Sequence, residues 1–121
     1  MALARKQNLD AVLASVAEHW APRTVQVVND YDVRVVKVLG EFTAHRHPET
    51  DEFFLVLAGR LTIKLGDESV VLGPGDTYVV RRGHLHQPVA DVETTVLLFE
   101  PSETVNTGDS PSELTAGRRV I

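Results

Sequence analysis

Short runs of β-forming residues, separated by turn residues, occupy most of the chain after residue 24. Valine and threonine dominate these runs, and Leu61–Leu65 alternates apolar and polar side chains as a strand with one buried face does. Turn pairs such as Gly66-Asp67 and Gly73-Pro74 end the runs. Strands are expected over residues 24–29, 33–39, 41–45, 52–58, 60–65, 69–72, 77–81, 86–89 and 95–100. Because no stretch between them is long enough for a crossover helix, the pattern predicts an all-β sandwich or barrel.

The segment before residue 24 predicts one N-terminal α-helix over residues 8–20. Asn8 is a suitable N-cap, and Pro22 disfavours helical backbone at the residue before it. The apolar residues recur at helical spacing and would form one stripe packed against the sheet: Leu9, Val12, Leu13, Val16 and Trp20.

A chain of 121 residues is expected to form one domain. We expect three parts within it. Residues 1–23 form the helix and its lead-in, residues 24–100 form the barrel, and residues 101–121 form an extended, irregular tail. The tail holds few large apolar groups, and we expect it to wrap the barrel or a partner.

Charge and composition exclude several classes of function. The formal net charge is −5 and the basic residues show no clustering beyond isolated pairs, which argues against a nucleic-acid partner. The lack of cysteine excludes disulfides, thiolate metal ligands and a cysteine nucleophile. No apolar run approaches the ~20 residues that span a bilayer, and no apolar segment follows Arg5 and Lys6 as a signal peptide requires. We therefore expect a cytoplasmic protein without membrane partners.

Four of the five histidines fall into two pairs, His45 with His47 and His84 with His86. Residues i and i+2 of a strand share one face, so His45 and His47 can direct two imidazoles at one point. Glu52 stands at the start of an apolar run, where a charge needs a partner. Imidazole and carboxylate are common ligands of divalent metal ions, and the pattern therefore predicts a metal site.

The spacing of these residues resembles the first motif of the cupin superfamily. One residue separates His45 from His47, four separate His47 from Glu52, and six separate Glu52 from Gly59. Asp51 adjoins Glu52, but neighbours on a strand face opposite sides, so only one of the two acids can point inward. The spacing to Gly59 favours Glu52.

A later stretch resembles the second cupin motif. Five residues separate Gly75 from Arg81, and Gly83 and His86 follow. The two motifs together cover residues 40–90, and the resemblance implies a double-stranded β-helix, the jelly-roll barrel of cupins. It also implies a homodimer and one divalent metal ion (Fe, Mn, Ni, Zn or Cu). The implied metal ligands are His45, His47, Glu52 and His86.

Residues that share the inward face of a ligand, or lie near one, are expected to line a pocket beside the metal. These candidates are Thr43, Phe54, Val56, Tyr78 and His84. For Tyr78 the alternative is packing outside the barrel, and for His84 it is a place on the surface. We expect a metal-dependent enzyme that acts on a small organic molecule as a dioxygenase, isomerase or lyase. Two alternatives are a non-catalytic barrel that binds or senses a small molecule, and a degenerate barrel that serves as a stable dimer without a ligand. The intact set of four ligands argues against the second.

Overall fold

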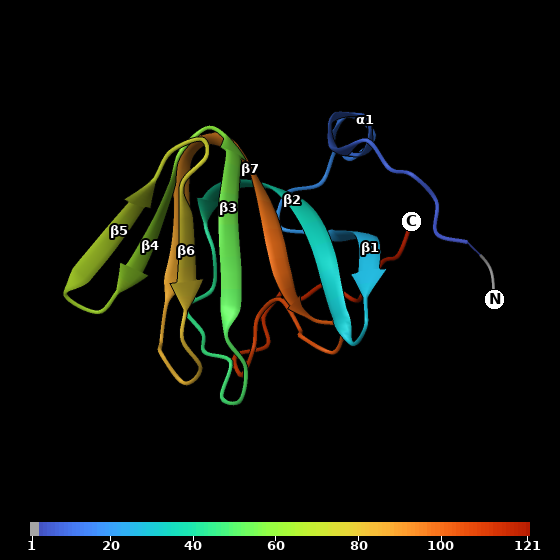
Figure 1. Cartoon of the computed structure of the whole chain (residues 1–121). Helices are drawn as coiled ribbons and strands as arrows, with labels where there is room; N and C mark the ends of the chain where they lie inside the picture. Colours follow the sequence, from blue (N-terminus) through green and yellow to red (C-terminus); the bar gives the residue numbers. More distant parts are fainter. Residues whose placement is uncertain (1–2) are drawn as a thin grey trace.

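The computed structural model describes residues 3–121 and consists mainly of antiparallel β-strands (Figure 1). One short helix, α1 (Leu9–Ala14), precedes them. The strands are β1 (Arg23–Val28), β2 (Tyr31–Glu41), β3 (Glu52–Ala58), β4 (Leu61–Leu65), β5 (Glu68–Leu72), β6 (Thr77–Val80) and β7 (Gln87–Pro101). Among these residues, no helix is long and apolar enough to cross a membrane.

The long strand β7 holds the sheet together. Its first residues pair with β4, from Lys64↔Gln87 to Thr62↔Val89, and its later residues pair with both β2 and β3. The main path of the sheet is β1-β2-β7-β3-β6, and the β4–β5 hairpin joins it through β7. The sheet thus folds over an interior as a jelly-roll barrel, and the expected all-β fold is confirmed (Figure 1).

Alternate residues of β3 and β7 fill this interior. Phe54 lies opposite Leu98 and Val56 opposite Val96, and all four side chains are buried. The interior also holds Val36 and Val38 from β2, and Leu61 and Ile63 from β4. Burial of such side chains stabilises each by about 1.5–3 kcal/mol relative to exposure.

The helix begins where the sequence predicts but is shorter than the expected 8–20. The Asn8 side chain accepts a hydrogen bond from the Ala11 N–H at 3.0 Å, and the helix ends at Ala14. Beyond it, the Lys37 ammonium donates to the Val16 carbonyl at 2.7 Å. A tertiary contact from β2 therefore takes the place of the last helical turns that the apolar spacing suggests.

Trp20 leaves the expected stripe altogether. Val12 and Leu13 pack on Val25 and Val35 outside the barrel, whereas Trp20 belongs to the interior cluster. Its backbone has φ 61°, which is uncommon for a residue other than glycine. The helical spacing of apolar residues therefore included Trp20 wrongly, because this side chain packs inside the barrel and not on the helix face.

Two strand predictions are wrong. The expected strand 41–45 is not separate, because β2 runs to Glu41 and only an isolated bridge pairs His45 with His86. The expected strands 86–89 and 95–100 are parts of one strand, β7. Residues 91–93, which lie between them, are all exposed, so the alternation of buried and exposed side chains is interrupted there.

The tail after β7 crosses the end of the barrel near the loops that follow β2 and β6 (Figure 1). The Arg118 guanidinium donates to both carboxylate oxygens of Asp32, at 2.8 and 2.9 Å. Thr24 donates to the Arg119 carbonyl, and the Ile121 N–H donates to the Thr24 carbonyl. The tail therefore wraps its own barrel.

Candidate metal centre

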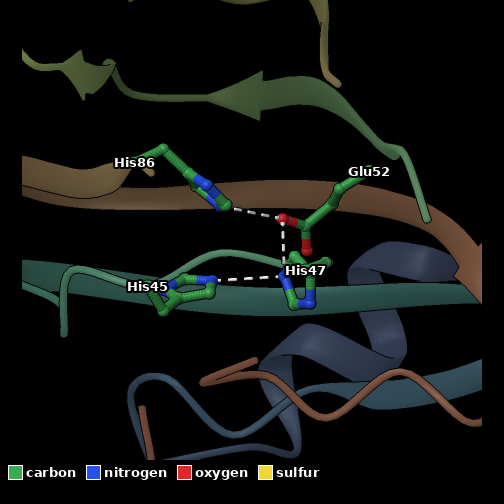
Figure 2. A group of neighbouring side chains, drawn as sticks. All are labelled: His45, His47, Glu52 and His86. Carbon is green, nitrogen blue, oxygen red and sulfur yellow. Dashed lines mark hydrogen bonds and ion pairs between the residues drawn. The ribbon is translucent and has the colours of Figure 1, made fainter. Parts of the chain in front are cut away.

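Three histidines and one glutamate meet inside one end of the barrel (Figure 2). His45 and His47 follow β2, Glu52 opens β3, and His86 directly precedes β7. The bridge between His45 and His86 joins the two loops, so residues 41 positions apart face each other. One potential ligand atom from each residue lies within 4.8 Å of the others.

The contacts converge on four atoms (Figure 2). Nε2 of His45 lies 3.2 Å from Nε2 of His47. Oε1 of Glu52 lies 3.4 Å from Nε2 of His47 and 3.3 Å from Nε2 of His86. All four side chains are buried: His45 and His86 are 1% exposed, Glu52 5% and His47 7%.

Backbone carbonyls fix the orientation of two of the imidazoles. Nδ1 of His45 lies 2.7 Å from the Thr43 carbonyl oxygen, and Nδ1 of His86 lies 3.0 Å from the His84 carbonyl oxygen. A carbonyl can only accept, so each Nδ1 carries the hydrogen. In the neutral rings Nε2 therefore carries a lone pair that faces the centre, which is the usual arrangement of a metal-binding histidine.

The protonation states favour a cation at the centre. Burial lowers the pKa of His45 to about 4, so this ring is neutral at pH 7. Burial alone would raise the pKa of Glu52, but its close contacts with His47 and His86 lower it well below the usual value. The neutral ring of His45 thus directs the lone pair of Nε2 toward the ionised carboxylate of Glu52, and a positive ion between them would satisfy both.

The separations fit one metal ion. Ligand nitrogen and oxygen atoms lie about 2.1 Å from such an ion, so adjacent ligands lie roughly 3–4 Å apart. The three contacts of 3.2, 3.3 and 3.4 Å fall in this range. Three imidazoles and one carboxylate suit Fe, Mn, Ni, Zn or Cu, and four ligands leave positions open for a substrate.

A second buried carboxylate, which the sequence analysis missed, lies beside Glu52. Glu100 is 1% exposed, and Arg34 donates to its Oε2 at a distance of 2.6 Å. Its Oε1 is one of two buried side-chain polar atoms without a hydrogen-bond partner among the described residues. Burial, together with the charge of Glu52, raises the pKa of Glu100 well above its usual value.

The available signal for Glu100 was strand parity. Leu98 and Val96 point inward on β7, and Glu100 continues their face. The pairing of Phe54 with Leu98 then sets Glu100 next to Glu52, but this register depends on the fold. The sequence therefore indicates that Glu100 points inward at the end of an apolar alternation, but it does not indicate that Glu100 lies next to Glu52.

An interior cavity of about 40 Å³ adjoins the centre. His45 and Glu52 form its polar end, and the other lining side chains are mainly apolar. They are Trp20, Pro22, Val36, Val38, Phe42, Phe54, Leu61, Pro88, Val96, Leu98 and Asn106. Trp20 and Phe42 stack with ring centroids 4.6 Å apart. Neither aromatic residue was among the expected pocket residues.

The structure places the five expected pocket residues differently from one another. Phe54 lines the cavity, whereas Val56 is fully buried in the interior cluster and is not among the lining residues. Tyr78 packs against the interior cluster from its partly buried position. The Thr43 hydroxyl contacts Ser112 at 2.8 Å, and His84 is exposed and presents its carbonyl to His86.

Asp51 lies outside the centre, as parity requires. Its carboxylate accepts a hydrogen bond from the Arg82 N–H at 2.8 Å and forms ion pairs with the side chains of Arg81 and Arg82. The backbone hydrogen bond to Arg82 is the main cause of its lowered pKa. This acid therefore fixes the loop before His86.

Comparisons with known proteins agree with this geometry. A family model described as a cupin domain matches residues 33–100. The uncharacterized protein YdbB of Bacillus subtilis is 36% identical over 112 residues, which cover 90% of this chain and 99% of that protein.

Solved structures share the fold. A cupin-2 domain containing protein from Shewanella frigidimarina is 38% identical, with a TM-score of 0.77, over 78% of this chain and 93% of that one. A hydroquinone 1,2-dioxygenase from Sphingomonas sp. TTNP3, with 4-hydroxybenzoate bound, is 16% identical. The match has a TM-score of 0.69 and covers 80% of this chain and 74% of the dioxygenase. At that identity the likeness shows the fold alone.

Proposed function

The chain belongs to the cupin family, and from this premise we propose that it is a metal-dependent enzyme acting on a small organic molecule. One observation carries the proposal: four buried ligand atoms converge within 4.8 Å directly beside an interior cavity. Buried ionisable groups that adjoin a cavity are the usual setting of a binding or active site.

We propose His45, His47, Glu52 and His86 as the ligands of one divalent ion. Such an ion, when bound, polarises a carbonyl or hydroxyl group, or takes part in oxygen chemistry if it is redox-active. The protein supplies the rest. The carbonyl partners of His45 and His86 hold each Nε2 toward the centre, and all four ligand side chains are buried.

The reaction type is a dioxygenase, isomerase or lyase reaction. The hydroquinone 1,2-dioxygenases share the fold, but their low identity to this chain transfers no substrate. Oxygen consumption by the iron-loaded protein, measured against small carbonyl and hydroxyl compounds, tests the first class. NMR of the same mixtures tests the other two. Binding without turnover across the panel would instead support the non-catalytic barrel.

The metal itself is tested by elemental analysis of the purified protein, before and after reconstitution. We expect close to one equivalent of a transition metal. His47→Ala should lose most of it, whereas His84→Ala is the matched control, because that side chain is exposed and lies outside the cluster. Occupancy below about a tenth of an equivalent after reconstitution would refute the proposal, since a four-ligand site of this type binds tightly.

We also propose that the protein forms a homodimer through the edge at β1. This strand ends the main path of the sheet, and four apolar side chains there are about half exposed. They are Val27, Val28, Val120 and Ile121. Sedimentation velocity at micromolar concentration should show a dimer that Val27→Lys weakens and Val71→Lys, on β5, leaves intact. A wild-type monomer would contradict this.

A further inference from the structure

The cavity beside the metal centre has one polar end and one apolar body. His45 and Glu52 form the polar end, and they are the only ionisable side chains that line the cavity in the part of the chain described. Val38, Val96 and Leu98 form part of the body. Because no cation lines that body, a charged group placed there would lose its hydration without compensation.

The hydrogen-bond donors of Asn106 and Trp20, which also line the cavity, already have partners within the protein. The Asn106 amide donates to the carbonyls of Trp20 and Leu114, and its oxygen accepts from the Ala116 N–H. The Trp20 indole N–H donates to the Leu39 carbonyl at 2.9 Å. Neither side chain has a free donor for a ligand, so both act as walls of the cavity rather than as polar anchors.

The aromatic wall is held in place on several sides. Trp20 is fixed by its indole hydrogen bond and by its backbone N–H, which donates to the Lys37 carbonyl at 2.8 Å. It keeps this position despite φ 61°, and backbone strain of this kind persists only where the surroundings impose it. Phe42 stacks on it and presents an edge to His45, with ring centroids 5.5 Å apart. A ligand that touches His45 therefore also meets a rigid apolar surface.

The volume limits the size of the ligand. An engineered apolar cavity of about 150 Å³ takes up benzene, whereas a single water needs at least about 10–15 Å³. At about 40 Å³, this cavity lies between the two. It has room for a short aliphatic group and not for an aromatic ring.

We propose that this cavity binds the apolar tail of a compact molecule, a tail of two to four carbons without charge or ring, whose oxygen-bearing head faces His45 and Glu52. The position of the head rests on the proposed metal function. The size and polarity of the apolar part of the ligand rest on the cavity alone. The proposed metal function and the proposed apolar subsite can therefore fail separately.

Trp20 provides a direct readout, because it is the only tryptophan in the chain and lines the cavity. Three 2-hydroxy acids share one metal-chelating head and differ in the tail: 2-hydroxybutanoate (ethyl), malate (carboxymethyl) and mandelate (phenyl). Each is titrated into protein loaded with Zn(II), and Trp20 emission is recorded. We expect a saturable change with 2-hydroxybutanoate and at least tenfold weaker binding of malate and mandelate. Equal affinity for malate, or for mandelate, would overturn the proposal.

Two variants test the size limit. Val38→Leu fills part of the free volume and should weaken 2-hydroxybutanoate at least tenfold. Leu98→Ala enlarges the cavity and should admit mandelate. If Leu98→Ala does not fold, Val38→Leu still decides, because unchanged 2-hydroxybutanoate affinity in that variant would place the tail elsewhere.

Metal-free protein separates the two proposals. Butan-2-one carries the same ethyl tail without a chelating head, and it should still change Trp20 emission, with Val38→Leu reducing the effect. If the protein binds no metal but this response is present, the metal function fails, and the proposal that the cavity binds the apolar part of the ligand stands. If metal binds but neither butan-2-one nor 2-hydroxybutanoate affects Trp20, the assignment of the tail fails.

Discussion

Replacing Gly108 with alanine tests how the tail supports the metal centre. Gly108 has φ 54°, in the left-handed region. A Cβ atom there would overlap the Arg46 carbonyl oxygen and stand 2.9 Å from Cδ2 of His45. Arg46 cannot retreat freely, because Asp109 holds its backbone through two hydrogen bonds of 3.0 Å, one from the Asp109 N–H and one to the Asp109 carboxylate.

The expected cost follows from these contacts. A left-handed backbone at a residue other than glycine costs about 1 kcal/mol. Separating Gly108 from Arg46 breaks the two hydrogen bonds with Asp109, each of which contributes about 1 kcal/mol. The free energy of unfolding should therefore fall by about 3 kcal/mol. For a chain of this size that lowers Tm by roughly 12 °C. Because His45 is displaced as well, metal affinity should fall about tenfold or more.

Calorimetry of metal-free protein gives the stability, and competition with a chelator gives the metal affinity. Two other glycines are matched controls. Gly66→Ala places a methyl at φ 73° with nothing within 4 Å, so it isolates the backbone cost. Gly117→Ala has open space and no left-handed φ, so it should change little. If Gly108→Ala loses no more stability than Gly66→Ala, the close approach to Arg46 and His45 is not a constraint and the reasoning fails.

Two further predictions concern the buried charges. The Arg118 hydrogen bonds hold the pKa of Asp32 well below its usual value, so Asp32 stabilises the fold above about pH 4 and this contribution is lost as pH falls through the folded-state pKa. Urea unfolding between pH 6 and 2.5 should show this loss in wild type and a flatter profile in Asp32→Asn. Glu100→Ala leaves Arg34 without one partner and Glu52 without its neighbour. We expect a loss of about 3–5 kcal/mol and 10–100-fold weaker metal binding by calorimetric titration, both largely restored in Glu100→Gln.

The sequence was most informative where the chemistry is local. His45 and His47 lie two residues apart, and Glu52 follows across one short loop, so their spacing groups them even though the expected strand at His45 does not form. His86 is distant in sequence, and only the likeness to the second cupin motif placed it with the others. The structure then shows the physical link, a bridge between His45 and His86 that brings the two loops together.

Local pattern failed where tertiary contacts decide the conformation. Trp20 continues the helical spacing of Val12 and Val16, and nothing in its neighbours signals a left-handed backbone. Its place is set by carbonyls of Lys37 and Leu39, on a strand that pairs elsewhere. The local sequence reports the helix propensity of the segment, but it does not report which distant carbonyls will accept hydrogen bonds from Trp20.

The tail, residues 101–121, shows why the four metal-binding residues alone do not identify the small molecule that the protein binds. The matched cupin region, residues 33–100, contains all four proposed ligands but neither Trp20 nor Asn106. These two residues line the cavity although they lie near opposite ends of the chain. Gly108, also in the tail, lies close to His45. Two chains could therefore share every metal ligand and still select different molecules, because part of the cavity wall lies outside the shared region. The substrate preference of this protein should accordingly change with substitutions of Trp20 and Asn106, which line the cavity and are not metal ligands.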